Sequence, residues 1–284
     1  MFRKICNLLL AILFICGAGI FFYPVVVDKM ADEERIEQIE QFQQSAHNEE
    51  QQEEDSLYTQ MQVYNQQIYE EGQAGMSDAW NSGSDTFDFS KTGLQDRMIG
   101  YLTIDKMNVH VPLYFGADDS TLNGGAAVLA QTSMPIGGTN TNSVIAAHRG
   151  GIHGAGVFKE IEKLQVGDHI TIANLWETLD YQVIKEIVID PKEIEAIKIV
   201  EGQDLVTLVS CHPYGIDTQR YLVYCQRVTE DMTEVNIPFE GEQYVSSERE
   251  ISLEKNIRTV GCVGIFGMLI LYIIRSLRRH HHKN

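Results

Sequence analysis

The sequence predicts a mainly β fold, a closed barrel of short strands with short helices, flanked by two transmembrane helices. From residue 98 to residue 228, short runs rich in β-branched and aromatic residues alternate with turn residues. Few helical patterns separate these runs, which favours a barrel over parallel strand–helix–strand units. Uncharged apolar runs lie near both ends of the chain, at 5–27 and 259–274.

The first apolar run, 5–27, predicts an uncleaved membrane anchor. It contains 23 residues without a charge, which is enough to cross a bilayer as a helix. A cleaved signal peptide is the alternative, but no small-residue cleavage pattern follows Val27.

The second run, 259–274, is slightly short for a membrane span, but Arg258 and Arg275 can snorkel to the membrane surface. Basic residues lie at the outer ends of both spans, in 1–4 and 275–284. By the positive-inside rule, both termini are cytoplasmic and the chain between the spans is extracytoplasmic. The sequence thus predicts a two-pass membrane protein.

The segment after the first span, 28–72, is acidic and predicts helix. Its apolar residues recur at three- and four-residue spacing, interrupted by a polar stretch at 43–50. The chain has a formal charge of −18, with ten acidic residues and one arginine between Asp32 and Asp55. This charge argues against nucleic acid or anionic lipid as a partner. The next segment, 73–96, is irregular, with isolated aromatic side chains that either fasten it to the barrel or plug a site.

The barrel itself is expected at 97–238, followed by a linker at 239–258. We expect a helical or loose segment at 122–130 and a short helix at 158–164. The expected strands are 99–104, 109–114, 141–147, 169–173, 179–189, 205–210 and 221–228.

The most informative stretch for function is the hairpin at 204–228. Its first strand closes at Cys211 and its second opens at Arg220, so a thiol and a guanidinium face a common space if the strands pair. The two-residue period of a strand points His212 to the other face, which makes it a poor partner for Cys211 although it is adjacent in sequence.

A general base must therefore come from elsewhere in the chain. His148 ends a strand just before a Gly-rich loop, and His110 and His153 are weaker competitors. A nucleophilic cysteine needs a cationic neighbour, an imidazole can take up and return its proton, and a guanidinium can stabilise an oxyanion. His148, Cys211 and Arg220 together predict a Cys–His acyl-transfer site.

The remaining cysteines and acids predict no further chemistry. Cys225 is the second external cysteine and could pair with Cys211, although these two strand positions need not lie close enough. We expect no metal or cofactor. Carboxylates at Asp118 and Asp119 could attract calcium, but scattered loop carboxylates are usually solvated.

The hairpin also carries a resemblance to a known family. Its first strand ends in Thr207-Leu208-Val209-Ser210-Cys211, with Arg220 nine residues later, which resembles the Thr-Leu-x-Thr-Cys…Arg signature of the sortases. These are membrane-anchored cysteine transpeptidases of Gram-positive bacteria. His148, in Ala146-Ala147-His148-Arg149-Gly150, matches the family's histidine, and Ser210 replaces the more frequent threonine. The resemblance implies an eight-stranded sortase barrel in which His148, Cys211 and Arg220 are catalytic.

The two predicted spans and the long segment before the barrel resemble class C, the pilin polymerases, whose lid carries an Asp-Pro-aromatic motif. Here Asp78-Ala79-Trp80 stands in the matching region, with Ala79 at the proline position. The resemblance implies a lid in which Asp78 pairs with Arg220 while Trp80 covers Cys211.

The resemblance also implies a reaction and its partners. Cys211 would cleave the Thr–Gly bond of a Leu-Pro-x-Thr-Gly-like sorting signal at the C-terminus of a pilin precursor, forming a thioacyl intermediate. A lysine of the next pilin would resolve this intermediate as an isopeptide bond. The alternatives are a sortase that anchors proteins to a peptidoglycan precursor, a hydrolytic cysteine peptidase, and a non-catalytic membrane-tethered β-barrel scaffold.

Overall fold

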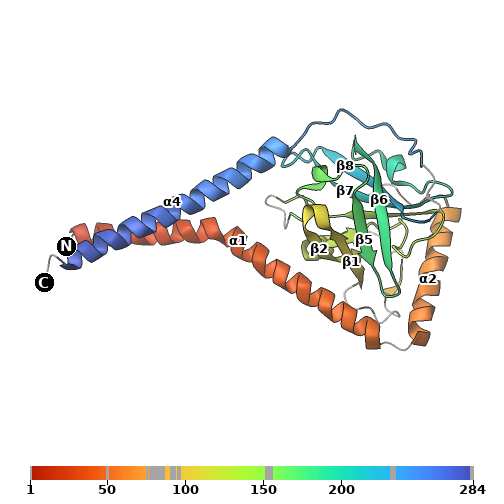
Figure 1. Ribbon diagram of the computed structural model, residues 1–284, viewed down its shortest axis with the longest axis horizontal. Coiled ribbons are helices and arrows are strands. Elements are labelled where there is room, and N and C mark those ends of the chain that lie inside the picture. Colours follow the sequence, from red (N-terminus) through yellow and green to blue (C-terminus); the bar gives the residue numbers. More distant parts are fainter. Residues whose placement is uncertain are drawn as a thin grey trace. The chain divides into compact units, whose positions relative to one another are not determined.

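The computed structural model describes residues 2–48, 51–74, 76, 87–89, 94, 97–150, 156–230 and 235–281. The chain divides into two compact units, one of residues 31–246 and one of residues 1–30 with 247–284. All the strands lie in the first unit (Figure 1).

Eight strands close into a barrel, which confirms the predicted fold class. Their order around the barrel is β1-β2-β3-β4-β7-β8-β6-β5. The pairs β2–β3 and β4–β7 are parallel and the other neighbours are antiparallel. The strands are β1 Met98–Ile104, β2 Val109–Phe115, β3 Ala126–Val128, β4 Thr141–Ala146, β5 His169–Ala173, β6 Thr178–Ile189, β7 Asp204–His212 and β8 Gln219–Arg227.

One strand differs from the expectation. The helical or loose segment expected at 122–130 is instead a short helix, α3 (Asp119–Gly124), followed by β3. β3 is the three residues Ala-Ala-Val, all buried, so it is too short for an alternating pattern to mark it in the sequence. In the described part of the chain, single-turn helices complete the connections: η3 (Asp105–Met107), η4 (Ile161–Lys163) and η5 (Ile194–Ile197).

The barrel buries apolar side chains on both faces of its central strands. An inner cluster takes residues from all eight strands, such as Leu102 of β1 and Leu208 of β7. A second cluster on the outer face takes the alternate residues, such as Val209 of β7 and Leu222 of β8, and includes Ile197 of η5. β7 is therefore buried on both sides, as its apolar pairs Leu205-Val206 and Leu208-Val209 predict.

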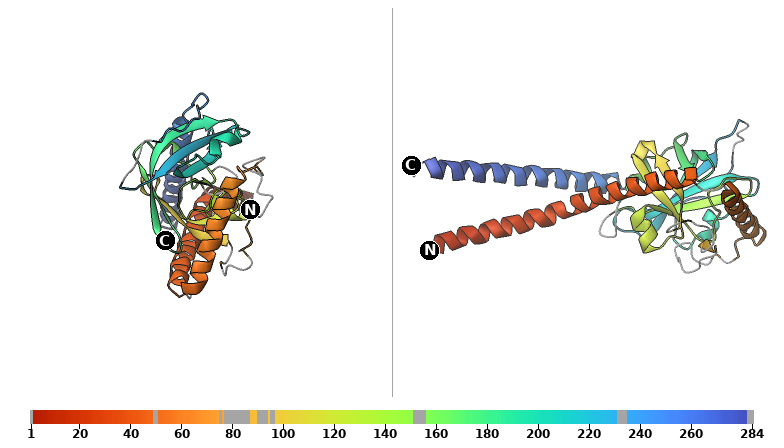
Figure 2. Two further views of the ribbon diagram at one scale, coloured as in Figure 1. Left: turned by 90° about the vertical axis from the view of Figure 1, so that its right-hand side faces the viewer. Right: turned by 90° about the horizontal axis from the view of Figure 1, so that it is seen from below.

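Two long helices precede the barrel, α1 (Phe2–Asn48) and α2 (Gln51–Glu70), in keeping with the helix predicted over 28–72. The predicted apolar stripes do pack on the barrel: Ile39 of α1 joins the outer cluster and Met61 of α2 joins the inner one. Asn65 fixes α2 further, because its side-chain amide exchanges hydrogen bonds of 3.2 and 2.7 Å with the backbone of Met134. Figure 2 shows α2 lying against the barrel.

The last helix, α4, runs over Glu248–His281, so the linker expected at 239–258 is helical from Glu248 onward. Among the described residues, only the helical stretch Glu248–Tyr272 is long and apolar enough to cross a membrane. The other expected span, 5–27, lies within α1, and the two-pass arrangement stays a prediction.

Candidate functional site

The hairpin of β7 and β8 pairs the predicted nucleophile with the predicted guanidinium. In this antiparallel ladder, Cys211 lies directly opposite Arg220. Directly opposed residues share a face of the sheet. Val209 and Leu222, two residues from each along the strands, belong to the outer cluster, so both functional side chains project from the outer face.

The third predicted residue, His148, follows the end of β4 on the other side of β7. β4 runs parallel to β7 with Ala146 beside Val209, and the amide of Ala147 donates to the Val209 carbonyl at 3.4 Å. His148 comes two residues after Ala146, on the segment whose Arg149 donates to the Cys211 carbonyl at 3.0 Å. The three predicted residues thus form a row in strand order: His148 on the segment that follows β4, Cys211 on β7 and Arg220 on β8.

The thiol of Cys211 lies between opposing electrostatic effects. Burial raises its pKa, Arg220 lowers it, Asp217 raises it and Arg149 lowers it, and the net result lies above the ordinary value. Burial therefore outweighs the two cations, and the sulfur is mainly protonated at neutral pH. A base is needed to generate the thiolate.

The guanidinium of Arg220 is held by backbone carbonyls at the start of β8 and in the loop before it. Its Nη1 donates to the carbonyl of Asp217 at 3.1 Å and to that of Gln219 at 2.9 Å. These bonds hold the side chain near its own strand, where its positive charge acts on the thiol of Cys211. A planar donor group so placed is suited to a carbonyl oxygen that becomes negative.

His212 and Cys225, which were considered as partners of Cys211, lie on the opposite face of the hairpin, as the two-residue period of a strand predicts. His212 is fully buried, and Cys225 belongs to the inner cluster. Both Cys211 and Cys225 are free thiols. Cys225 pairs with Val206, five residues along β7 from Cys211, which is about 16 Å at the rise of a strand, too far for a disulfide. Burial raises the pKa of the Cys225 thiol strongly, so it is a poor nucleophile.

Sequence reasoning missed a buried polar cluster behind Cys211. Arg149, adjacent to His148 in sequence, forms a buried ion pair with Glu162, and its Nη1 donates to the carbonyl of Cys211 at 3.0 Å. The phenol of Tyr244 donates to Glu162 at 3.0 Å. The only signal in the sequence was the position of Arg149 beside the predicted base, because its partners lie 13 and 62 residues away.

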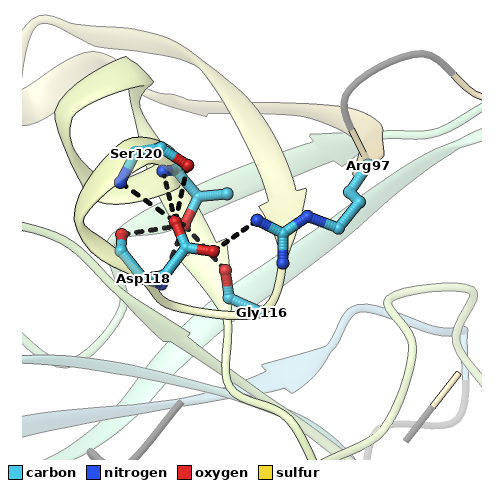
Figure 3. A network of polar contacts seen from close by, with 5 residues as sticks. Arg97, Gly116, Asp118 and Ser120 are labelled. Atoms are coloured by element: carbon cyan, nitrogen blue, oxygen red, sulfur yellow. Dashed lines mark hydrogen bonds and ion pairs between the residues drawn. The ribbon is translucent and has the colours of Figure 1, made fainter. Parts of the chain in front are cut away.

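The two acids weighed as a calcium site lie apart from this row, at the start of α3. Asp118 is the N-cap of that helix, accepting from the amides of Ser120 and Thr121 at 2.9 and 3.0 Å, and it forms an ion pair with Arg97 (Figure 3). Asp119 is exposed in the first turn. Asp118 thus fastens α3 and the start of β1 to each other. The proposed lid residues, Asp78 and Trp80, lie outside the described residues.

Comparisons with known proteins agree on one family. The profile of the sortase domain matches residues 102–228. Clostridium perfringens sortase C, solved with the C-terminal cell wall sorting motif, is 31% identical, with a TM-score of 0.59 over 68% of this chain and 99% of that one. Sortase C1 of GBS Pilus Island 1 is 28% identical, with a TM-score of 0.62 over 72% of this chain and 97% of that one.

A curated relative, sortase A of Streptococcus agalactiae serotype III (strain NEM316), is 22% identical over 131 residues. That match spans 45% of this chain and about half, 52%, of the relative. The eight-stranded closed barrel and the likeness to class C structures over nearly their whole length point the same way. The chain belongs to the sortase family, in its class C.

Proposed function

We propose that this protein is a membrane-anchored cysteine transpeptidase that cleaves Leu-Pro-x-Thr-Gly-like sorting signals and joins pilin subunits through isopeptide bonds. The observation that carries the proposal is the pairing of Cys211 with Arg220 on β7 and β8, with His148 on the segment that follows the neighbouring strand β4. In this proposal His148 is the base, Cys211 the nucleophile and Arg220 the oxyanion stabiliser.

In the first step, the imidazole of His148 takes the proton of the Cys211 thiol, and the sulfur attacks the carbonyl carbon of the threonine. The carbonyl oxygen becomes negative and is stabilised by the guanidinium of Arg220. The C–N bond of the Thr–Gly pair then breaks, and the imidazolium returns its proton to the leaving amine. The acyl group stays on Cys211 as a thioester.

In the second step, the side-chain amine of a pilin lysine attacks the thioester carbon. His148 accepts the proton of that amine, an isopeptide bond forms, and the Cys211 sulfur leaves and is reprotonated. Two solved relatives support this choice of substrates, since one is described with a cell wall sorting motif and the other comes from a pilus island.

Membrane attachment and a lid complete the proposal. Membrane spans at both ends of the chain would hold the barrel on the outer side of a Gram-positive membrane, with α4 as one anchor. Asp78 and Trp80 would occupy the site until a sorting signal arrives, with Asp78 paired to Arg220 and Trp80 over Cys211.

The test is a transpeptidation assay with the full chain in detergent micelles. The substrates are a Leu-Pro-x-Thr-Gly peptide and candidate pilin domains with accessible lysines, and mass spectrometry detects a Thr–lysine isopeptide bond. Cys211→Ala should abolish the product, whereas Cys225→Ala, a matched change on the opposite face of the same hairpin, should keep it.

Each alternative has its own outcome in this assay. Product formed only with a peptidoglycan-precursor amine would favour the anchoring enzyme, and release of the free acid alone would indicate a hydrolase. Peptide left uncleaved by the wild type in the presence of every acceptor would contradict the proposal and favour a scaffold.

A further inference from the structure

The structure contains a second arginine beside the proposed nucleophile, on the opposite face of β7 from Arg220. Arg149 uses one nitrogen, Nη1, for the Cys211 carbonyl at 3.0 Å and for Nδ1 of His212 at 3.1 Å. Its other terminal nitrogen pairs with the carboxylate of Glu162. A guanidinium has a fixed fork of donors, so three acceptors from two separate elements fix its position.

The surroundings of Arg149 are shielded from water. Its side chain is 2% exposed, and that of Glu162 is 9% exposed. His212 is fully buried, with the Tyr221 ring 5.6 Å and the Tyr244 ring 5.9 Å from its own, centre to centre. Nδ1 of His212 also lies 3.3 Å from the carboxylate of Glu162, so Arg149, Glu162 and His212 form one buried polar cluster.

The acceptor that matters for catalysis is the backbone carbonyl of Cys211 itself. The Arg149 side chain comes from the residue after His148, so one guanidinium ties the segment after β4 to the end of β7. The hydroxyl of Ser210 adds a second tie between the same segments, donating to the Ala147 carbonyl at 2.9 Å. Together with the backbone bond from Ala147 to Val209, these two bonds tie the segment that carries the proposed base to the strand that carries the proposed nucleophile.

The positive charge of Arg149 also acts on the sulfur. The charged groups that act on the Cys211 thiol are Arg220 and Asp217 from the β7–β8 hairpin and Arg149 from the segment after β4. His148 is the titratable residue next to Arg149 on that segment. Arg149 therefore favours the thiolate from the inner side while Arg220 does so from the outer side.

We propose that Arg149 is a positioning residue for the transpeptidation reaction: it clamps the Cys211 carbonyl and keeps a fixed, buried positive charge behind the nucleophile. The expected effect of Arg149 on the reaction rate rests on the proposed function. The electrostatic part of the inference concerns Cys211 alone and is measurable without any substrate.

Two variants separate the clamp from the charge. Arg149→Lys keeps the charge and loses the fork. The double variant Arg149→Met with Glu162→Gln removes both charges together, so neither is left buried without its partner. The matched control is Arg227→Met with Glu177→Gln, which removes an ion pair at the far end of β8.

The first measurement is the alkylation rate of Cys211 by iodoacetamide, read by mass spectrometry on the peptide that contains Cys211, as a function of pH. We expect the double variant to be alkylated about two- to threefold more slowly near neutral pH, because Arg149 lowers the pKa of this thiol less than Arg220 does. The control variant and Arg149→Lys should match the wild type in this assay.

The second measurement is cleavage of a Leu-Pro-x-Thr-Gly peptide. Arg149→Lys should lower kcat about tenfold or more with KM changed less than about twofold, because a misplaced nucleophile affects the chemical step. Melting temperatures are recorded for every variant. A lower kcat for Arg149→Lys at an unchanged melting temperature would support the positioning role.

Several results would overturn the inference. If the double variant is alkylated at the wild-type rate, the charge of Arg149 does not act on Cys211. If Arg149→Lys keeps the wild-type kcat, the hydrogen bond from Arg149 does not position Cys211. A change in melting temperature alone, or failure of every variant to fold, means that Arg149 serves the fold and not the reaction. If the wild-type enzyme cleaves no peptide, the proposed function fails, while the alkylation data still decide whether Arg149 acts on Cys211.

Discussion

Replacing Asp118 should lower the free energy of unfolding, because this residue both caps α3 and pairs with Arg97 at the start of the barrel. The structure lets us estimate the two contributions separately. Asp118 caps α3 through a reciprocal capping box with Thr121, whose hydroxyl accepts from the Asp118 amide at 3.0 Å. It also forms the ion pair with Arg97, the residue just before β1 (Figure 3). Asp118→Ala removes the cap and the charge, whereas Asp118→Asn keeps a good capping side chain and removes only the charge.

The expected magnitudes follow from these contacts. Loss of the cap costs about 1 kcal/mol in the free energy of unfolding. The ion pair is partly exposed, with side chains 27% and 35% accessible, so screening limits its contribution to about 0.5 kcal/mol. We therefore expect a loss of about 0.5 kcal/mol for Asp118→Asn and about 1.5 kcal/mol for Asp118→Ala. In a unit the size of 31–246, the alanine change corresponds to a melting temperature lowered by about 3–6 °C.

The pH dependence gives a second, independent check. Burial alone would raise the pKa of Asp118, but hydrogen bonds from Arg97, Ser120 and Thr121 and the charge of Arg97 hold it well below its usual range. A depressed pKa in the folded state stabilises the fold above the unfolded value of about 3.9, and that stabilisation is lost as the pH falls below it. The difference between wild type and Asp118→Asn should therefore stay constant above about pH 5 and shrink as the pH falls from about 4 toward the folded-state pKa.

The assay is thermal unfolding of the full chain in detergent micelles, followed by near-ultraviolet circular dichroism at several pH values. Arg97→Gln and the double variant with Asp118→Asn complete a double-mutant cycle that isolates the ion pair. An Asp118→Ala protein that melts with the wild type would refute the capping argument. A gap that widens on acidification would refute the charge argument.

Four further predictions concern the site and its surroundings. Arg220→Lys should lower kcat for sorting-signal cleavage about a hundredfold while leaving the melting temperature within about 2 °C, since lysine lacks the planar fork; an active lysine variant contradicts this role. Alkylation of Cys211 should speed up as the pH rises, with an apparent pKa above the ordinary thiol value, because burial outweighs the nearby cations; a rate that is flat across neutral pH contradicts it. Replacing Asp78 and Trp80 together by alanine should raise the rate of Cys211 labelling if they cover the site, and equal rates count against a lid. Gly241→Ala should lower the melting temperature, measured by circular dichroism, because its new methyl would lie 2.9 Å from a side chain of β6 and 3.2 Å from its backbone; unchanged melting would mean that the segment shifts freely.

The parts of the site that sequence could predict are those set by local geometry. Cys211 and Arg220 face each other because one hairpin with alternating residues determines both the pairing and the face. The same alternation correctly predicted that His212 points to the opposite face from Cys211. By contrast, the placing of His148 beside Cys211 depends on β4 running parallel to β7, a pairing between strands more than fifty residues apart. The sequence singled out His148 by its position at a strand end before a Gly-rich loop, and the family resemblance supported that choice, but neither predicted the strand pairing.

The features that sequence missed depend on long-range packing. β3 is recognisable only by its place between β2 and β4, since three small buried residues carry no periodic signal. The start of α4 at Glu248 was missed because its first turns are polar and resemble a linker. The buried cluster around Arg149 joins residues up to 82 positions apart, and charged side chains in a sequence are usually read as solvent-exposed.

Cys211 combines a feature that the sequence predicted, its pairing with Arg220, with one that it did not, the contact with Arg149. Both are possible because β7 has two faces. A residue in such a strand can point its side chain to the outer face while its backbone carbonyl accepts a hydrogen bond from a side chain on the inner face. Cys211 occupies such a position, since its thiol lies in the outer row and its carbonyl accepts from Arg149. The backbone that carries the nucleophile is thus held by a buried side chain on the opposite face of β7. Substitutions in the buried cluster should therefore reduce the rate of the chemical step while leaving recognition of the sorting signal largely intact.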